Sequence, residues 1–163
     1  MNYAHIHLTV NHFPIIFPMV AVIVLITGFI FKSEVMKRTA YFIFALGAIS
    51  TVFAIISGEK AAGYTHTMDW FQKSLVHEHH ESAEFFGIFS YILGLLSVVA
   101  LWASWKGKQF SKWLSYIVLI FSFVTMFLAK NAGSTGGDIR HTEIRTEQNT
   151  VEQPANVEDE EQN

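Results

Sequence analysis

Histidine supplies most of the side chains in this 163-residue sequence that could do chemistry. There are eight histidines and no cysteine, so disulfides, iron–sulfur clusters, thiolate metal sites and covalently attached c-type haem are excluded. Imidazole ligates haem iron and the ions of copper, zinc and iron, and a carboxylate can assist it. The chemistry to expect is therefore ligation of a haem or a metal ion by histidine.

Two of these histidines closely precede the first apolar stretch. His7 and His12 are five positions apart, which is about 140° around a regular helix, so one would ligate while the other supports it. Pro14 is typical of a first helical turn, and Asn11 is a candidate N-cap. His12 would then lie at the membrane interface, as a ligand or as a solvated side chain.

A polar segment with three more histidines precedes the third apolar stretch. If it forms a helix, one stripe of that helix consists of His77, His80, Glu81 and Glu84, with His79 beside it. Such a stripe suits a metal or haem site in which carboxylates orient the imidazoles, and it also suits a solvated helix start. The sequence has no H-E-x-x-H or E-x-x-H motif, which weakens a zinc-protease or ferritin-like di-iron interpretation.

Glycines and a further histidine follow the fourth apolar stretch. Gly136 and Gly137 would end the helix or allow a backbone to approach a flat ligand closely. Arg140 could pair with a carboxylate or a haem propionate, and His141 is a candidate ligand. His66, which follows the second stretch, is in a similar setting.

The composition shows which elements must position these residues. Hydrophobic residues make up 51% of the chain and charged residues 15%, whereas soluble domains carry about a quarter charged residues. The charge-free apolar stretches are 13–31, 40–57, 85–105 and 113–129. About 20 helical residues cross the hydrocarbon core of a bilayer, where backbone N–H and C=O groups must form their hydrogen bonds within the protein. We therefore predict an all-α bundle of four transmembrane helices. The net charge of −3 argues against nucleic acid as a partner.

Positive charge predicts the orientation in the lipid bilayer. The short connections 32–39 and 106–112 hold six of the eleven Lys and Arg residues, so the positive-inside rule puts both connections in the cytoplasm. Both termini, the 58–84 loop and all eight histidines then lie on the outer side of the membrane. Residues 1–141 form the transmembrane domain, and the acidic segment 142–163 forms a disordered tail.

The two halves of the chain are faintly alike. Each has a histidine before a span, a short basic loop, and a second span that ends in small residues. This likeness pairs His12 with His80, and His66 with His141. A pseudo-two-fold axis along the membrane normal would then bring these four imidazoles to one outer cavity.

Two motifs resemble those of a bacterial family of four-helix membrane proteins of unknown function. The family opens with a pattern close to H-P-x-x-V-H-F-P-I. Residues 7–15 keep its histidine spacing and the H-F-P-I element, but have Leu8 in place of the proline and Asn11 in place of the valine. The family closes with a pattern similar to G-G-x-L-V-x-x-H-G, which residues 136–141 resemble with altered spacing. A histidine before the third helix is also usual in the family, and His79 or His80 matches it. Because relatives are sometimes fused to or encoded near cytochrome c or Rieske-type proteins, the resemblance implies membrane redox chemistry.

Three functions agree with these residues. In the first, paired histidines bind one or two b-type haems near the outer face, and electrons pass between the quinone pool and a periplasmic c-type cytochrome or another membrane redox subunit. In the second, histidine and carboxylate bind a copper, zinc or iron ion directly. In the third, the chain is a structural or assembly subunit of a respiratory membrane complex.

We place the haem hypothesis first, with His12 and His80 as the leading ligands. The candidate haem-binding residues are His7, His12, His66, His77, His79, His80, Gly136, Gly137, Arg140 and His141. The candidate ligands of a metal ion are His7, His12, His80, Glu81, Glu84 and His141. The sequence leaves open whether the chain is an enzyme and whether it forms a homodimer.

Overall fold

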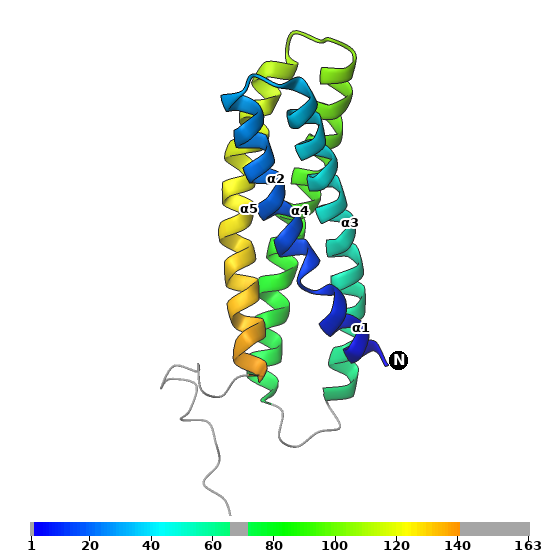
Figure 1. Ribbon diagram of the computed structural model, residues 1–163. Coiled ribbons are helices and arrows are strands. Elements are labelled where there is room, and N and C mark those ends of the chain that lie inside the picture. Colours follow the sequence, from blue (N-terminus) through cyan, green and yellow to red (C-terminus); the bar gives the residue numbers. More distant parts are fainter. Residues whose placement is uncertain (1, 66–71, 141–163) are drawn as a thin grey trace, which may run out of the picture.

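A computed structural model describes residues 2–65 and 72–140 as a bundle of helices (Figure 1). The helices are α1 (Tyr3–Val10), α2 (Phe13–Ile30), α3 (Glu34–Thr65), α4 (Lys73–Trp105) and α5 (Ser111–Arg140). Within these described residues, four helical stretches are long and apolar enough to cross a membrane, with α1 and α2 together forming the first. The predicted all-α bundle of four transmembrane helices is therefore confirmed. The predicted acidic tail, 142–163, lies outside the described residues.

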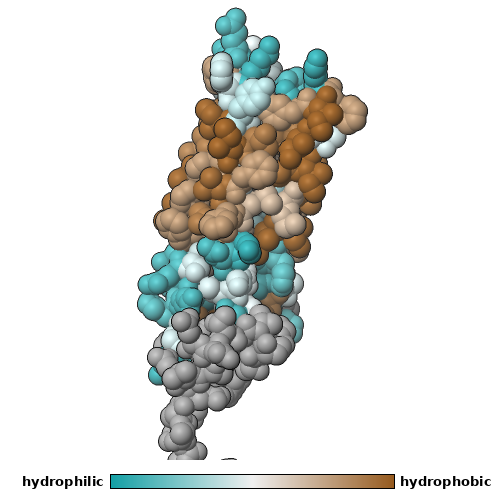
Figure 2. Space-filling view, turned by 90° about the vertical axis from the view of Figure 1, so that its left-hand side faces the viewer, coloured by the Kyte–Doolittle hydropathy of each residue, from teal (hydrophilic) through white to brown (hydrophobic). Residues whose placement is uncertain are grey.

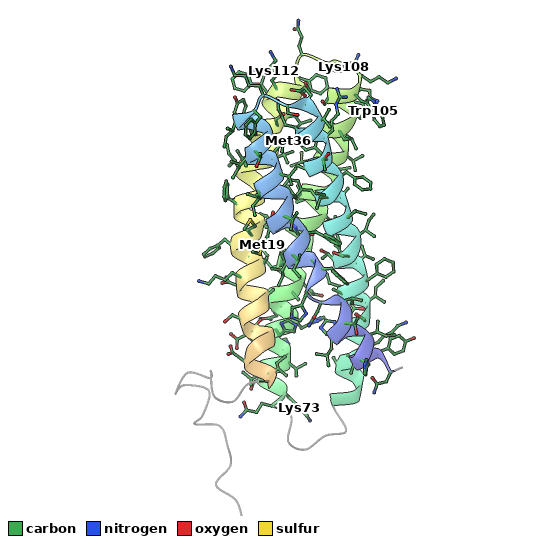
Figure 3. The ribbon with its side chains drawn as sticks, in the orientation of Figure 1. Met19, Met36, Lys73, Trp105, Lys108 and Lys112 are labelled. Carbon is green, nitrogen blue, oxygen red and sulfur yellow. The ribbon has the colours of Figure 1, made fainter. Side chains whose placement is uncertain are left out.

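The bundle has two chemically different ends, with an apolar band between them (Figure 2). One end carries the connections from α2 to α3 and from α4 to α5, where Trp105, Lys108 and Lys112 lie (Figure 3). We call it the lysine end. The other end contains α1 and the first turns of α4, where Lys73 lies, and we call it the histidine end. Polar ends around an apolar band are what a bilayer requires of a spanning bundle.

Both connections at the lysine end use the same kind of turn. Lys32 follows α2 with a φ of 52°, and Gly107 follows α4 with a φ of 62°. In each turn a backbone N–H reaches a carbonyl five residues back, from Ser33 to Gly28 and from Lys108 to Ala103, each at 2.9 Å. These bonds satisfy carbonyls that the helix ends would otherwise leave without partners.

At the histidine end the helices continue well beyond the apolar stretches. α4 begins twelve residues before Phe85, and α5 runs on to Arg140. The predicted helix end at Gly136 and Gly137 is therefore wrong. Both glycines lie inside α5, and Gly136 leaves room for a side chain of α4, as described below.

The first span is broken near its start. Asn11 closes α1, because its backbone N–H donates to the carbonyl of His7 at 2.9 Å, and His12 is the N-cap residue of α2. Pro14 lies in the first turn of α2 as predicted, but the prediction that Asn11 caps α2 is wrong. The break gives α1 its own direction, and it packs on α3.

Small residues allow α3 and α4 to approach each other closely. A Cβ atom added to Gly94 would overlap the Cβ of Ala48, and one added to Gly87 would lie 2.6 Å from the Cδ1 of Ile55. Between these levels, the hydroxyls of Thr51 and Ser90 are hydrogen-bonded at 2.8 Å. Close backbone approach and interhelical hydrogen bonds are the main sources of helix association within lipid.

The same pattern of burial occurs twice along the chain. The buried residues Pro14, Pro18, Ala21, Val22, Leu25 and Gly28 of α2 are matched, seventy-two positions later, by Phe86, Ser90, Leu93, Gly94, Ser97 and Ala100 of α4. In the second helix of each half, Lys37, Ala40, Phe44, Gly47, Thr51 and Ala54 are matched, seventy-eight positions later, by Ser115, Val118, Ser122, Thr125, Ala129 and Ala132. The predicted repeat of two hairpins thus has a definite register. The predicted pairing of His12 with His80 is wrong, because this register pairs His7 with His79, and His12 with Glu84.

An ionic network ties α3 to α4 at the lysine end. Arg38 donates from Nε to the Oγ of Ser104 and from Nη2 to its carbonyl, both at 2.9 Å. The Ser104 hydroxyl donates to Glu34 at 3.0 Å, and Lys37 donates to the other oxygen of the same carboxylate at 2.6 Å. Each charge that is drawn into the bundle therefore has a charged or hydrogen-bonding partner.

We predict that Gly94→Val destabilises the bundle, because the added methyl groups would force α3 and α4 apart. Overpacking of this kind costs about 1–3 kcal/mol, and thermal unfolding in detergent would measure it. Gly63→Val is the matched control, since a Cβ atom there meets nothing within 4 Å. Equal unfolding temperatures for the two variants would contradict the close packing.

The orientation in the membrane can be tested because the chain has no native cysteine. We expect Lys108→Cys, at the lysine end, to react with a membrane-impermeant maleimide only after intact cells are permeabilised. Lys73→Cys, at the histidine end, would react in intact cells. The reverse pattern would show that the positive-inside assignment is wrong.

Candidate functional site

Two histidines from different helices meet at the histidine end. The ring centroids of His7, on α1, and His79, on α4, are 6.4 Å apart, and the ring planes cross at 67°. Both side chains are half-buried, and the repeat places them at equivalent positions in the two halves of the chain. The site is therefore built from one imidazole of each half.

The imidazole of His7 is held by α3. Its Nδ1 lies 3.0 Å from the carbonyl oxygen of Ala54 and 3.3 Å from the hydroxyl of Ser57. Because the Ser57 hydroxyl itself donates to the Ala54 carbonyl at 3.0 Å, both groups act as acceptors toward the ring. Nδ1 must then carry the proton, and Nε2 of a neutral His7 keeps its lone pair.

The imidazole of His79 is held by α5 in the same way. Its Nδ1 lies 3.1 Å from the hydroxyl of Thr135, which donates to the carbonyls of Asn131 and Ala132 at 3.2 Å. The Ala132 carbonyl is a further acceptor for the ring. His79 therefore has the same tautomer as His7, with Nε2 as the nitrogen that can bind a ligand.

A glycine beside each imidazole gives it room. A Cβ atom added to Gly58 would lie 3.0 Å from the Cε1 of His7 and 3.2 Å from its Nδ1. A Cβ atom added to Gly136 would lie 3.0 Å from the Cε1 of His79 and 3.3 Å from its Nδ1. Each half thus supplies the same four parts: an imidazole, a carbonyl, a hydroxyl and a glycine.

This arrangement is the one that metal-binding histidines use. A ligating imidazole usually donates its other N–H to a carbonyl, carboxylate or hydroxyl, which fixes the tautomer and the direction of the ring. The two ring centroids are 6.4 Å apart, and Nε2 of His7 and Nε2 of His79 would be the atoms that hold a metal ion or a haem iron.

The predicted stripe on α4 forms, but it lies on the surface. His77 pairs with Glu81 at 3.3 Å and His80 with Glu84 at 3.4 Å. The side chain of His77 is 72% exposed and that of His80 is 44% exposed, so these pairs face solvent. They behave as ordinary polar pairs on a helix surface.

The other predicted site residues are also separated from the pair or lie outside the described residues. His12 is exposed at the start of α2, and Gly137 follows Gly136 as a half-buried residue. His66, His141 and the side chain of Arg140 lie outside the described part of the chain. Within the described ranges, no three His, Asp or Glu side chains converge as a metal site.

The residues that hold the two imidazoles were not identified from the sequence. The sequence feature that could have identified them is a repeated five-residue motif, A-x-x-[ST]-G. It is present at residues 54–58 (A-I-I-S-G) and again at residues 132–136 (A-G-S-T-G). It places a carbonyl and a hydroxyl one helical turn apart, with a glycine directly after the hydroxyl. The motif is too short to stand out before the register of the repeat is known.

One family model, described as "Predicted membrane protein (DUF2231)", matches residues 4–143. The match includes both imidazoles and both copies of the A-x-x-[ST]-G motif. No curated protein and no solved structure shows significant similarity to the chain.

We predict that Gly136→Ala lowers stability relative to Gly133→Ala. Both substitutions give α5 the same gain in helix propensity, but the Cβ at position 136 presses on His79, whereas at position 133 it would make an ordinary 3.4 Å contact with Ile15. Displacing the ring weakens its hydrogen bond to Thr135, which is worth about 1 kcal/mol. Thermal unfolding in detergent measures the difference, and equal stability would show that the ring is not confined by the glycine.

Proposed function

The chain belongs to the DUF2231 family of predicted membrane proteins, and we propose that it is a membrane electron-transfer protein that binds b-type haem between His7 and His79. The observation that supports this function is the pair of imidazoles, each held through Nδ1 and each left with Nε2 as a ligand atom. When bound, haem would supply one-electron redox chemistry. His7 and His79 would hold it, and the rest of the chain would supply burial and hydrogen bonding.

The number of available ligands favours haem over a bare metal ion. A haem iron is already bound by its porphyrin and would need few further ligands from the protein, so His7 and His79 could hold it without a third side chain. A zinc or copper ion held by protein alone takes three or four ligands. Within the described residues, His7 and His79 are not joined by a third His, Asp or Glu at metal-binding distance.

The surroundings of the pair provide low polarity on one side. Phe86, Ala129 and Ala132 form a buried apolar cluster, with Ile15 and Leu128 packed against it. Because the Ala132 carbonyl also faces His79, this cluster lies next to the site. Apolar burial disfavours the more highly charged form of a redox centre and so influences its potential.

The position of the pair in the bundle indicates the side of the membrane on which the proposed electron transfer would take place. The site lies at the end of the bundle opposite the lysine-rich connections, which the positive-inside rule assigns to the cytoplasm. We therefore place the site at the periplasmic face of a bacterial inner membrane, between the quinone pool and a c-type cytochrome or another membrane redox subunit.

A transition-metal ion is the second candidate ligand. α3 ends at Thr65 and α5 ends at Arg140, so His66 and His141 come directly after the two helices that hold the pair. A copper, zinc or iron ion would need further ligands of this kind besides His7 and His79.

The haem proposal predicts a Soret band in the detergent-purified protein after addition of haem. We expect His7→Ala and His79→Ala to reduce haem affinity at least tenfold, because each removes one axial ligand. His12→Ala and His80→Ala are the matched controls and would bind as the native chain does. Titration followed by visible absorbance, before and after reduction, measures the affinity.

Three results would overturn this function. If the native chain binds no haem but retains stoichiometric copper, zinc or iron, the metal-ion candidate replaces it. If neither binds, the pair serves only to join the helices. If haem binds and both His7→Ala and His79→Ala leave the affinity unchanged, the ligands have been assigned to the wrong residues.

A further inference from the structure

We infer that Ser57 and Thr135 are positioning residues, whose hydroxyls select the tautomer of His7 and His79 and thereby make Nε2 the ligand atom. The ligand role of Nε2 rests on the proposed function, whereas the choice of tautomer does not. The two hydroxyls occupy equivalent places in the A-x-x-[ST]-G motifs of α3 and α5. Each lies directly before the glycine that makes room for the ring.

The hydroxyls can act in this way because their own protons are already used. Ser57 donates to the Ala54 carbonyl at 3.0 Å, and Thr135 donates to the carbonyls of Asn131 and Ala132 at 3.2 Å. A hydroxyl that donates elsewhere can only accept from the imidazole. The Nδ1–H form of each ring is therefore favoured over the Nε2–H form.

The two halves depend on their hydroxyls to different degrees. For His7, the Ala54 carbonyl at 3.0 Å is closer to Nδ1 than the Ser57 hydroxyl at 3.3 Å. For His79, the Thr135 hydroxyl lies at 3.1 Å. Loss of the hydroxyl should therefore weaken the tautomer preference of His79 more than that of His7, while the Ala132 carbonyl retains part of the preference of His79.

The hydroxyls should also influence a bound haem. An acceptor for Nδ1–H makes the imidazole a stronger donor through Nε2, which stabilises the oxidised iron. Removal of the acceptor would raise the reduction potential. This effect differs from that of a residue that only packs against the ring.

The first test is NMR of cofactor-free protein labelled with ¹⁵N-histidine in detergent. The His79 signals are assigned from the spectrum of His79→Ala. We expect His79 to be mainly the Nδ1–H tautomer in the native chain, to have a smaller population of that tautomer in Thr135→Val, and to recover the native population in Thr135→Ser. Ser57→Ala should change the His7 tautomer less than Thr135→Val changes that of His79.

The inference is overturned if Thr135→Val keeps the native population of the Nδ1–H tautomer, or if Thr135→Ser lowers that population as much as Thr135→Val does. This test needs no haem, so the haem proposal can fail while the tautomer result stands. In haem-loaded protein, redox titration should give a higher midpoint potential for Thr135→Val than for the native chain and Thr135→Ser. An unchanged potential would overturn the role of the hydroxyl in tuning a bound haem.

Discussion

Close contact between helices is the constraint on which this structure depends. Lipid gives apolar helices no hydrophobic gain for associating, so a bundle must be held by van der Waals packing and by hydrogen bonds between helices. Here Gly94 and Gly87 bring α4 against α3, and the hydroxyl pair of Thr51 and Ser90 lies between them. The larger apolar side chains can then face outwards, where the exposed surface forms the band seen in Figure 2.

The same use of small and hydroxyl-bearing residues builds the site at the histidine end. Gly58 and Gly136 give the imidazoles room, while Ser57 and Thr135 accept their protons. Because the chain repeats this construction, two equivalent rings meet where its halves come together. A ligand bound there would contact both halves in the same way.

Much of the fold could be predicted from the sequence. Charged side chains and unpaired backbone groups are costly in lipid, so membrane-spanning helices are long charge-free stretches that are easy to recognise. The four spans, the proline at the start of α2 and the helical stripe from His77 to Glu84 were all predicted correctly. The length of the helices was not, because an apolar stretch marks the part of a helix in lipid and says little about where that helix ends. Gly136 was read as a helix end, although the structure uses it to accommodate a side chain of α4.

The site itself was only partly predictable. The sequence indicated histidine ligation at one end of the bundle, but His12 and His80 were favoured for their positions next to the spans. Burial shows that the register of the repeat pairs His7 with His79 instead. That register depends on which residues of four helices face inwards, which the nearly uniform hydrophobicity of the spans conceals.

The break between α1 and α2 links ligand affinity to the docking of a single short helix. α1 has no fully buried residue. Its described contacts with α3 include the hydrogen bonds of His7, and the Tyr3 ring lies beneath the Lys60 ammonium at 4.6 Å. A ligand that bridges His7 and His79 would therefore hold α1 against the bundle. By mass action, a higher concentration of that ligand would make detachment of α1 less favourable. The amino-terminal segment would then report the loading of the protein through its resistance to proteases.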